Sequence, residues 1–190
     1  MKIKADISGF VLAGGKSNRM GTDKALLLVQ EETLLIRIKN LIDPFCKTVE
    51  ISGYNSDYSD FNIKMIPDLY PGIGPVSGLI SSLKHSSTEW NLLVSVDTPF
   101  INKELIQSLI TQIGDYDCII PEHDGGVEPL IGLYNRQILP QLEEVINQGD
   151  YKLMRLVAKL NTRYLDCRPL IQKHPRLFFN INRPEDYNSI

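Results

Sequence analysis

The sequence of 190 residues has few of the features that mark secreted, membrane-bound or nucleic-acid-binding proteins. Its three cysteines are widely separated and form no metal-ligand or disulfide spacing, so we expect buried thiols in a reducing cytoplasm. No apolar run approaches the roughly 20 residues that span a bilayer. The net charge of -3 provides no general attraction to nucleic acid or anionic lipid. We therefore expect a cytoplasmic protein that binds neither nucleic acid nor membrane, and whose phosphate-binding groups, if any, are local.

The chain also lacks internal repeats and linkers rich in proline and glycine, so we expect a single domain over residues 1–190. Short β-branched apolar runs alternate with amphipathic helical stretches. This alternation predicts an α/β fold, a three-layer sandwich whose mostly parallel central sheet has helices on both faces. The predicted strands are residues 7–12, 48–52, 64–66, 91–96, 118–121, 130–134 and 162–166. The predicted helices are residues 33–42, 75–83, 102–113, 137–147 and 151–160.

A glycine pair follows the first predicted strand, in the segment LAGGKSNRMGTDKAL at residues 12–26. Gly14 and Gly15 let backbone amides approach a ligand closely, and successive amides that point into one concavity form an anion site. Arg19 and Lys24 add positive charge nearby, arginine as a planar fork and lysine as a point charge. This combination predicts a site for the phosphates of a nucleoside triphosphate.

Two better-known phosphate-binding motifs are missing from the sequence. A Walker A loop that ends in the GKS of residues 15–17 needs a glycine at position 10, which is Phe10. The dinucleotide fingerprint GxGxxG is missing too, because GIGPVSG at residues 72–78 has one residue too many before its third glycine. The glycine-rich segment is therefore expected to form a different kind of phosphate loop.

Two aspartates follow predicted strands further along the chain. Asp68 lies in IPDLYPGIGPVSGL at residues 66–79, where Gly78 and neighbouring glycines let the loop and helix pass close to a ligand. Asp97 lies in SVDTPF at residues 95–100, at the end of the most hydrophobic strand, where the ligand crevice of a parallel sheet is found. Asp68 could accept hydrogen bonds from a sugar or base, and Asp97 has the oxygen ligands that Mg²⁺ prefers. Each could also be an ordinary turn or capping residue.

Two later segments complete the candidate site. EPLIGLY at residues 128–134 follows a polar loop, and Glu128 or His123 could contact a second substrate, although a plain strand after a turn explains the segment equally well. FFNINRPEDY at residues 178–187 contains Asn180 and Asn182, which could position an acceptor or bind the water shell of a metal. An asparagine-capped helix that begins near Pro184 is the structural alternative, and both readings can hold.

These segments together resemble one family. Residues 12–26 closely resemble the LAGGxSxRMGxDKxL signature of molybdenum cofactor guanylyltransferases, which are Rossmann-like nucleotidyltransferases. The segments at 66–79, 95–100, 128–134 and 178–187 resemble the matching segments of that family, so the resemblance extends from Leu12 to Tyr187. Arg183 stands where the family usually has threonine, and Tyr54 where it often has asparagine, with Asn55 beside it.

The resemblance implies Mg²⁺-dependent transfer of GMP from GTP to the terminal phosphate of molybdopterin, with release of pyrophosphate and formation of molybdopterin guanine dinucleotide. It also implies transient contacts with a molybdenum insertase or molybdoenzyme chaperones, and a monomer or weak oligomer. The implied catalytic residues are Arg19, Lys24 and Asp97, and Asp97 is the implied Mg²⁺ ligand. Asn180 and Asn182 are the implied acceptor-binding residues. The implied nucleotide-binding residues are Leu12, Ala13, Gly14, Gly15, Lys24, Asp68, Gly78 and Asp97.

Two other functions stay open. The first is the same chemistry with CTP as donor or with a sugar or polyol phosphate as acceptor. The short loops after Asp97 favour the molybdenum branch, because sugar-nucleotide relatives usually carry longer acceptor-binding insertions. The second is a nucleotide-binding module without catalysis, against which the joint presence of Arg19, Lys24 and Asp97 argues.

Overall fold

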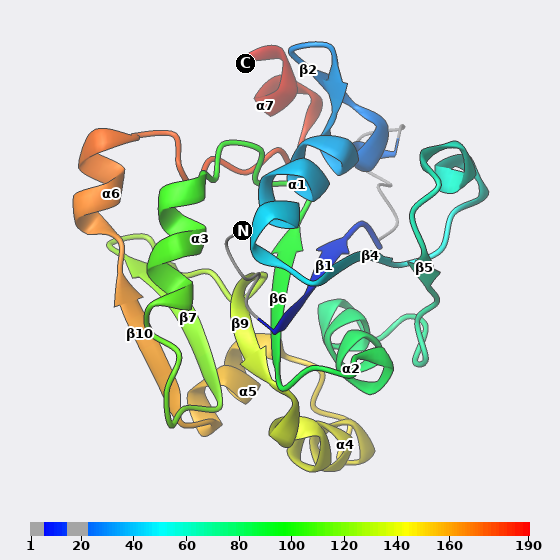
Figure 1. Ribbon diagram of the computed structural model, residues 1–190, viewed down its shortest axis with the longest axis vertical. Helices are drawn as coiled ribbons and strands as arrows, with labels where there is room; N and C mark the ends of the chain where they lie inside the picture. The colour runs from blue at the N-terminus through cyan, green and yellow to red at the C-terminus, as the bar shows by residue number, and fades with distance from the viewer. Residues whose placement is uncertain (1–5, 15–22) are drawn as a thin grey trace.

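One mixed sheet forms the centre of the computed structural model, which describes residues 6–14 and 23–190. Within those residues its strands follow the order β10-β7-β9-β6-β1-β4-β5, and β8 pairs with β7 (Figure 1). β9 runs antiparallel to β6 and β7, β8 runs antiparallel to β7, and the other pairs are parallel. The strands are β1 (Ile7–Leu12), β4 (Thr48–Ser52), β5 (Met65–Ile66), β6 (Trp90–Ser95), β7 (Cys118–His123), β8 (Gly126–Val127), β9 (Ile131–Asn135) and β10 (Thr162–Asp166). A separate hairpin joins β2 (Leu28–Val29) to β3 (Glu32–Thr33).

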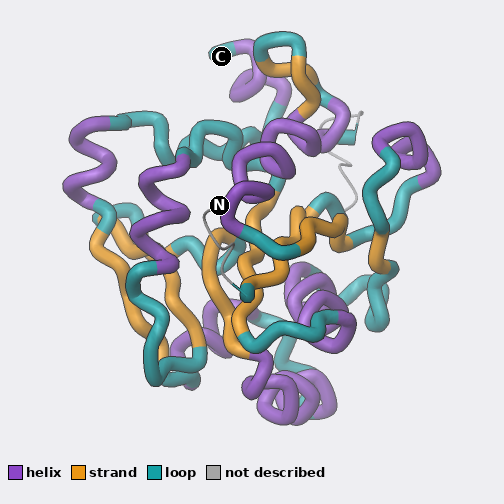
Figure 2. Tube along the Cα trace, in the orientation of Figure 1, coloured by secondary structure: helices purple, strands orange, loops and turns teal. Residues whose placement is uncertain are grey.

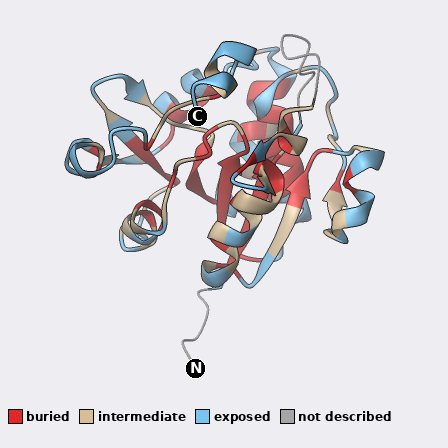
Figure 3. Ribbon diagram, turned by 90° about the horizontal axis from the view of Figure 1, so that it is seen from above, coloured by how far each residue is buried: buried red, intermediate tan, exposed pale blue. Residues whose placement is uncertain are grey.

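Helices cover both faces of this sheet, as Figure 2 shows. Alternate residues of β1 point to opposite faces, so that Val11 packs in one apolar core and Phe10 in the other. The Val11 core contains α1 (Leu34–Ile42), α3 (Lys103–Ile110) and α6 (Arg168–Lys173). The Phe10 core contains α2 (Pro75–His85), α4 (Leu139–Asn147) and α5 (Leu153–Lys159). The buried residues accordingly gather in the middle of the molecule (Figure 3).

Short elements connect these layers. The 3-10 turns are η1 (Lys24–Leu26), η2 (Asp43–Phe45), η3 (Ser56–Phe61) and η4 (Arg136–Ile138). A last helix, α7 (Pro184–Asn188), lies beside the β2–β3 hairpin, because the Tyr187 hydroxyl donates to the carbonyl oxygen of Leu28 at 2.8 Å (Figure 1). The C-terminal helix is therefore held against the β2–β3 hairpin.

The predicted three-layer α/β architecture with a mostly parallel sheet is confirmed. Each predicted strand is present with small shifts of its ends, and Asn102 caps α3 by accepting the Leu105 amide at 3.0 Å. The helix predicted for 102–113 was too long, since α3 ends at Ile110, and the one predicted for 137–147 begins as the 3-10 turn η4. The β2–β3 hairpin and α6 were not predicted, because each is too short for a periodic pattern to show.

The cysteines and the hydrophobicity of the helices were two features on which the sequence led to an expectation. Cys46, Cys118 and Cys167 are all buried, as predicted. Burial raises the pKa of Cys118 and of Cys167 to about 11, so both stay protonated at neutral pH. Among the described residues, none of the helices combines the length and hydrophobicity that crossing a bilayer requires.

The parallel pairing of β1 with both β4 and β6 sets the place of the candidate site. The pairing continues past the strand ends, where the Ala13 amide donates to Ser52 at 3.1 Å and the Val96 amide donates to Leu12 at 3.2 Å. The chain runs from β1 outward to β4 and β5 and then returns to β6 on the other side of β1. Ligands in such sheets bind beyond the carboxyl ends of the strands, at this reversal.

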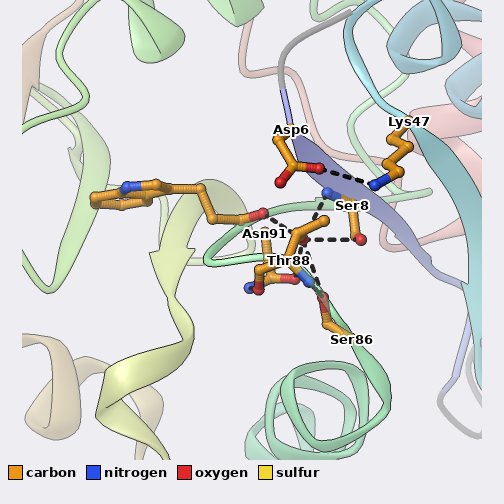
Figure 4. Close-up of polar contacts among 7 residues, drawn as sticks. Asp6, Ser8, Lys47, Ser86, Thr88 and Asn91 are labelled. Carbon is orange, nitrogen blue, oxygen red and sulfur yellow. Dashed lines mark hydrogen bonds and ion pairs between the residues drawn. The ribbon is translucent and has the colours of Figure 1, made fainter.

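A buried polar cluster joins β1 to β6 at the opposite edge of the sheet (Figure 4). The Thr88 hydroxyl accepts the Ser8 amide at 3.1 Å and donates to the Trp90 carbonyl at 2.9 Å. The hydroxyl oxygens of Ser8 and Ser86 lie 2.9 and 3.1 Å from it. Thr88 is 3% exposed, so these groups depend on each other rather than on water.

We expect Thr88→Val to lower the free energy of unfolding by about 1–3 kcal/mol, because it leaves buried partners of the hydroxyl unsatisfied. Urea unfolding followed by circular dichroism measures the change. Ser87→Ala, at the exposed neighbouring position, is the control and should stay within about 0.5 kcal/mol of the wild type. Equal stability of Thr88→Val and the wild type would show that the cluster does not hold the two strands together.

Candidate active site

A cleft with a volume of about 640 Å³ opens at the carboxyl edge of β1, β4 and β6. Its size suits a small-molecule ligand. Five of the residues predicted to bind a nucleotide or metal line it together, although they lie far apart in the sequence. The lining residues are Leu12, Gly14, Ser52, Asp68, Pro71, Gly72, Gly74, Pro75, Gly78, Ser95, Asp97 and Leu130.

Gly14 lines the cleft and lies against Gly53 where the end of β1 meets the end of β4, and this pair of glycines forms the glycine floor of the site. A Cβ atom on Gly53 would lie 2.9 Å from the Gly14 amide nitrogen, and Gly53 has a φ of +119°, so this position needs glycine. A Cβ atom on Gly14 would instead lie 3.8 Å from an Asp68 carboxyl oxygen, toward the cleft. The Ala13 amide donates to the Ser52 carbonyl in this structure, and the predicted nucleotide contact of Ala13 stays a prediction.

Asp68 is held at one side of the cleft by the loop between β5 and α2. The Ser81 hydroxyl accepts the Leu69 amide at 2.9 Å, and the Ser77 hydroxyl accepts the Tyr70 amide at 3.3 Å. Both serines are buried on α2, so the helix fixes the path of the loop. Gly74, with a φ of +80°, turns the chain into Pro75 at the first position of α2, as the sequence predicted.

The Asp68 carboxyl is partly buried, and this burial raises its pKa above the ordinary value, while a hydrogen bond with Ser77 acts in the opposite direction. A carboxylate that is partly removed from water but has few partners is costly to the fold. Such a group is a candidate for ligand binding, because the donors of a ligand can replace the lost water.

Asp97 lies two residues beyond the end of β6, in the turn that leaves the sheet. Its carbonyl oxygen accepts the Ile181 amide at 2.8 Å, which places the C-terminal segment beside it. The clamp of Arg176 against Phe100 and Phe179, with the guanidinium 4.4 and 4.8 Å from the two rings, fixes this contact further.

Asn180 precedes Ile181 and has a buried side-chain oxygen, Oδ1, that finds no hydrogen-bond partner among the described residues. Buried oxygens in proteins are normally paired, so an unpaired one calls for an explanation. The oxygen belongs to the segment that runs beside Asp97. Asn180 is not one of the residues that line the cleft, so its expected role toward an acceptor or the water shell of a metal stays a prediction.

Lys24 and Asn182 come from opposite ends of the chain and meet directly. The Lys24 ammonium donates to the Asn182 Oδ1 at 3.0 Å. α7 begins at Pro184, as the alternative reading of this segment predicted, but Asn182 is not its side-chain cap. Instead the Asp186 carboxylate accepts the amides of Asn182 and Arg183, each at 2.8 Å. The Asn182 side chain is thereby left to contact Lys24.

Other predicted residues have different surroundings. Gly15 and Arg19 lie outside the described residues. The Gly125 amide donates to His123 Nδ1 at 3.0 Å, so Nε2 carries the proton and donates to Glu128 at 3.0 Å. The His123 ring also stacks on Phe178 at 4.8 Å. His123 and Glu128 therefore bind each other beside the C-terminal segment.

Sequence reasoning missed two groups of site residues. Ser52 and Ser95 line the cleft at the carboxyl ends of β4 and β6, where the general rule about carboxyl ends could have selected them. Leu130 precedes β9, whose amino end reaches this edge because β9 runs antiparallel to β6, and that reversal has no sequence signal. Asp23, which precedes Lys24, accepts hydrogen bonds from the side chains of Asn55 and Tyr58. These contacts join separate segments of the chain, so no local sequence pattern could have predicted them. Tyr54, noted as a departure from the family pattern, is 71% exposed, while Asn55 faces Asp23.

We expect Asp68→Asn to raise the free energy of unfolding at pH 7 and to weaken nucleotide binding. Because the pKa of Asp68 is raised on folding, the folded protein holds this proton more tightly than the unfolded chain, and its stability falls as the pH rises through that range. Asparagine does not ionise, so its advantage at pH 7 should shrink toward pH 4. Urea unfolding at pH 7 and at pH 4 measures the difference in the free energy of unfolding between the variant and the wild type. A variant that is less stable than the wild type at both pH values would contradict the expected gain in stability.

Comparison with known proteins agrees with this geometry. A protein of Clostridium perfringens described as a probable molybdenum cofactor guanylyltransferase is 31% identical over 188 residues, covering 96% of this chain and 95% of that protein. One of Flavobacterium johnsoniae with the same description is 32% identical over 185 residues, covering 97% of this chain and 96% of that protein.

Solved structures agree as well. The crystal structure of molybdopterin-guanine dinucleotide biosynthesis protein A from Archaeoglobus fulgidus superposes with a TM-score of 0.80 and 26% identity, covering 96% of this chain and 95% of that chain. The model of the MobA-like NTP transferase domain matches residues 9–164 of this sequence. With a match over most of its length and relatives above 30% identity across nearly the whole chain, the protein belongs to the MobA-like NTP transferase domain family.

Proposed function

We propose that this protein transfers GMP from GTP to the terminal phosphate of molybdopterin, forming molybdopterin guanine dinucleotide and pyrophosphate. The observation that carries the proposal is the single cleft in which Asp68, the glycine floor and Asp97 meet at the carboxyl edge of the sheet. The guanylyltransferase descriptions of the relatives support the choice of donor and acceptor. The chemistry itself requires positioning and charge neutralisation more than a covalent intermediate.

In this proposal the nucleoside of GTP occupies the side of the cleft that Asp68 and α2 form. The Asp68 carboxylate accepts hydrogen bonds from the sugar or the base, and Gly78 lets α2 approach the ligand closely. The phosphates lie over Gly14 and Gly15 and are held by Arg19 and Lys24. Asn182 accepts a hydrogen bond from the Lys24 ammonium, and this contact supports a defined position for the lysine in the proposed site.

The reaction forms one bond and breaks one. An oxygen of the acceptor phosphate attacks the α-phosphorus of GTP, and the bond from this phosphorus to the oxygen that bridges to the β-phosphate breaks. The bonding electrons leave with pyrophosphate. Because the acceptor phosphate is already ionised at neutral pH, it needs no general base. Lys24 neutralises the charge that grows near the α-phosphate, and Asn180 positions the acceptor.

The donor groups present fit a Mg²⁺ ion as the cofactor. Mg²⁺ is usually bound by one or two carboxylates together with substrate phosphates and waters. Asp97 supplies the carboxylate, and the unpaired Asn180 oxygen can accept from a metal-bound water. No cluster of three or more metal-binding side chains of the His, Cys, Asp or Glu type occurs in the part of the chain that the structure describes, so phosphates and waters would complete the coordination. When bound, the ion neutralises phosphate charge.

We expect GTP to stabilise the purified protein selectively in the presence of Mg²⁺. A nucleotide at about 100 times its dissociation constant adds roughly 2.7 kcal/mol to the free energy of unfolding. Thermal unfolding with GTP, CTP, ATP and UTP, each with and without Mg²⁺, measures the selectivity. A preference for CTP would support the cleft as a nucleotide-binding site but would overturn the assignment of GTP as the donor. No response to any nucleotide would overturn the proposal, and so would GTP binding without pyrophosphate release when molybdopterin is added.

We expect Asp97→Asn to lower the rate of pyrophosphate release at least about a hundredfold, equivalent to about 2.7 kcal/mol of transition-state stabilisation. The substitution keeps the size of the side chain, so thermal unfolding should show an intact fold. Asp115→Asn is the matched control, because Asp115 is exposed and lies before β7, at the opposite edge of the sheet. Unchanged turnover in Asp97→Asn would exclude Asp97 as the metal ligand.

A further inference from the structure

The turn that carries Lys24 is held by hydrogen bonds to the neighbouring residue, Asp23. The residues that make these hydrogen bonds do not line the cleft. Asp23 precedes Lys24, and its carboxylate accepts the Ala25 amide at 2.9 Å, which caps the single turn of η1. The other carboxyl oxygen accepts the Tyr58 hydroxyl at 2.6 Å and the Asn55 amide nitrogen at 2.8 Å. Three donors from two separate segments therefore converge on the residue next to Lys24.

Tyr58 is the rigid part of this network. It is 1% exposed and lies in η3, and its hydroxyl oxygen is also 3.3 Å from the Ala13 carbonyl oxygen. Burial and the hydrogen bond to Asp23 raise the pKa of Tyr58, so the phenol keeps its proton and acts as a donor. Its hydroxyl thus connects Asp23 to the end of β1, where the glycine floor begins.

Asn55 is the second donor and also shapes its own segment. Its side-chain oxygen accepts the Asp57 amide at 3.0 Å, which caps η3, while its nitrogen faces Asp23. The two ends of the amide are therefore both occupied, one within η3 and one toward the Lys24 turn. This position directly follows Tyr54.

The opposite side of the turn is also restrained. Ala25 is 0% exposed in the core, and the Leu27 amide donates to the Lys24 carbonyl at 3.0 Å. The backbone of Lys24 is consequently fixed by Asp23 before it and Ala25 after it, and its side chain reaches Asn182. A lysine is long and flexible, so its ammonium has a defined place only if its backbone is held.

We propose that Tyr58 and Asn55 are positioning residues, which act through Asp23 to hold Lys24 against the phosphates of the bound nucleotide. This inference rests on the proposed function, because it assigns the phosphates to Lys24. Neither residue touches the substrate in this arrangement. All three hydrogen bonds to the Asp23 carboxylate are charge-assisted, and the one from the Tyr58 hydroxyl is the shortest at 2.6 Å. Its loss should therefore loosen the turn most.

Tyr58→Phe tests the proposal, because it removes the hydroxyl and keeps the buried ring. We expect faster hydrogen exchange in peptides that contain Ala25, and a roughly tenfold weaker affinity for GTP, equivalent to about 1.4 kcal/mol. The affinity for guanosine, which has no phosphate, should be unchanged. Asn55→Asp should act in the same direction, since it keeps the oxygen that caps η3 but sets a second carboxylate against Asp23.

A double-mutant cycle separates positioning from general destabilisation. In a Lys24→Ala background, Tyr58→Phe should weaken GTP binding no further, because Tyr58 acts through Lys24. An additive loss would overturn the inference. Thr88→Val is the control for lost stability, because it perturbs the opposite edge of the sheet and should leave the ratio of GTP to guanosine affinity unchanged.

Hydrogen exchange and nucleotide affinity together separate a failure of the positioning role from a failure of the proposed function. Unchanged hydrogen exchange in Tyr58→Phe would overturn the positioning role whatever the protein binds. Faster exchange in Tyr58→Phe would show that the hydrogen-bond network holds the turn. If Lys24→Ala nevertheless binds GTP as tightly as the wild type, Lys24 does not contact the phosphates, and that part of the proposal is overturned. Equal losses of GTP and guanosine affinity in Tyr58→Phe would show a purely structural role.

Discussion

The parallel hydrogen bonding of β1 to β4 and β6 is the constraint on which the rest of this structure depends. Parallel neighbours bring their carboxyl ends to one edge, so Gly14, Ser52 and Asp97 become neighbours although they lie in three separate motifs. At the end of β4, Gly53 lies directly against the Gly14 backbone, where a Cβ atom would come within 2.9 Å of the Gly14 nitrogen. The place of the cleft therefore follows from strand direction, combined with a position at the end of β4 that only glycine fits.

A second set of contacts joins the ends of the chain around this cleft. Lys24 and Asn182 are hydrogen-bonded although 158 residues separate them, and Ile181 is bonded to Asp97. The short helix α7 supports both contacts, because Asp186 fixes the backbone at Asn182. The C-terminal segment is thus held beside Asp97 and Lys24, the two residues with which its asparagines are proposed to act.

The residues of the site are not the residues that stabilise the fold. Asp68 is partly buried with a raised pKa, Gly74 has a backbone conformation that other residues adopt only with strain, and the Asn180 oxygen is buried without a partner in the described structure. Each of these features costs free energy in the folded protein. The apolar cores on the two faces of the sheet and the Thr88 cluster at its far edge offset such costs.

The sequence by itself determined the class of fold and selected several residues that the structure brings to one cleft. Alternation of apolar strands and amphipathic helices depends on local periodicity, and Gly14, Asp68 and Asp97 stand at strand ends that such periodicity locates. Only the tertiary structure decided how these residues are used. Asn182 could have capped a helix, and instead contacts Lys24, because Asp186 performs the capping. Asn55 and Tyr58 meet Asp23 only through folding, since hydrogen bonds between distant segments follow from the packing of η3 against β1 and leave no pattern in the linear chain.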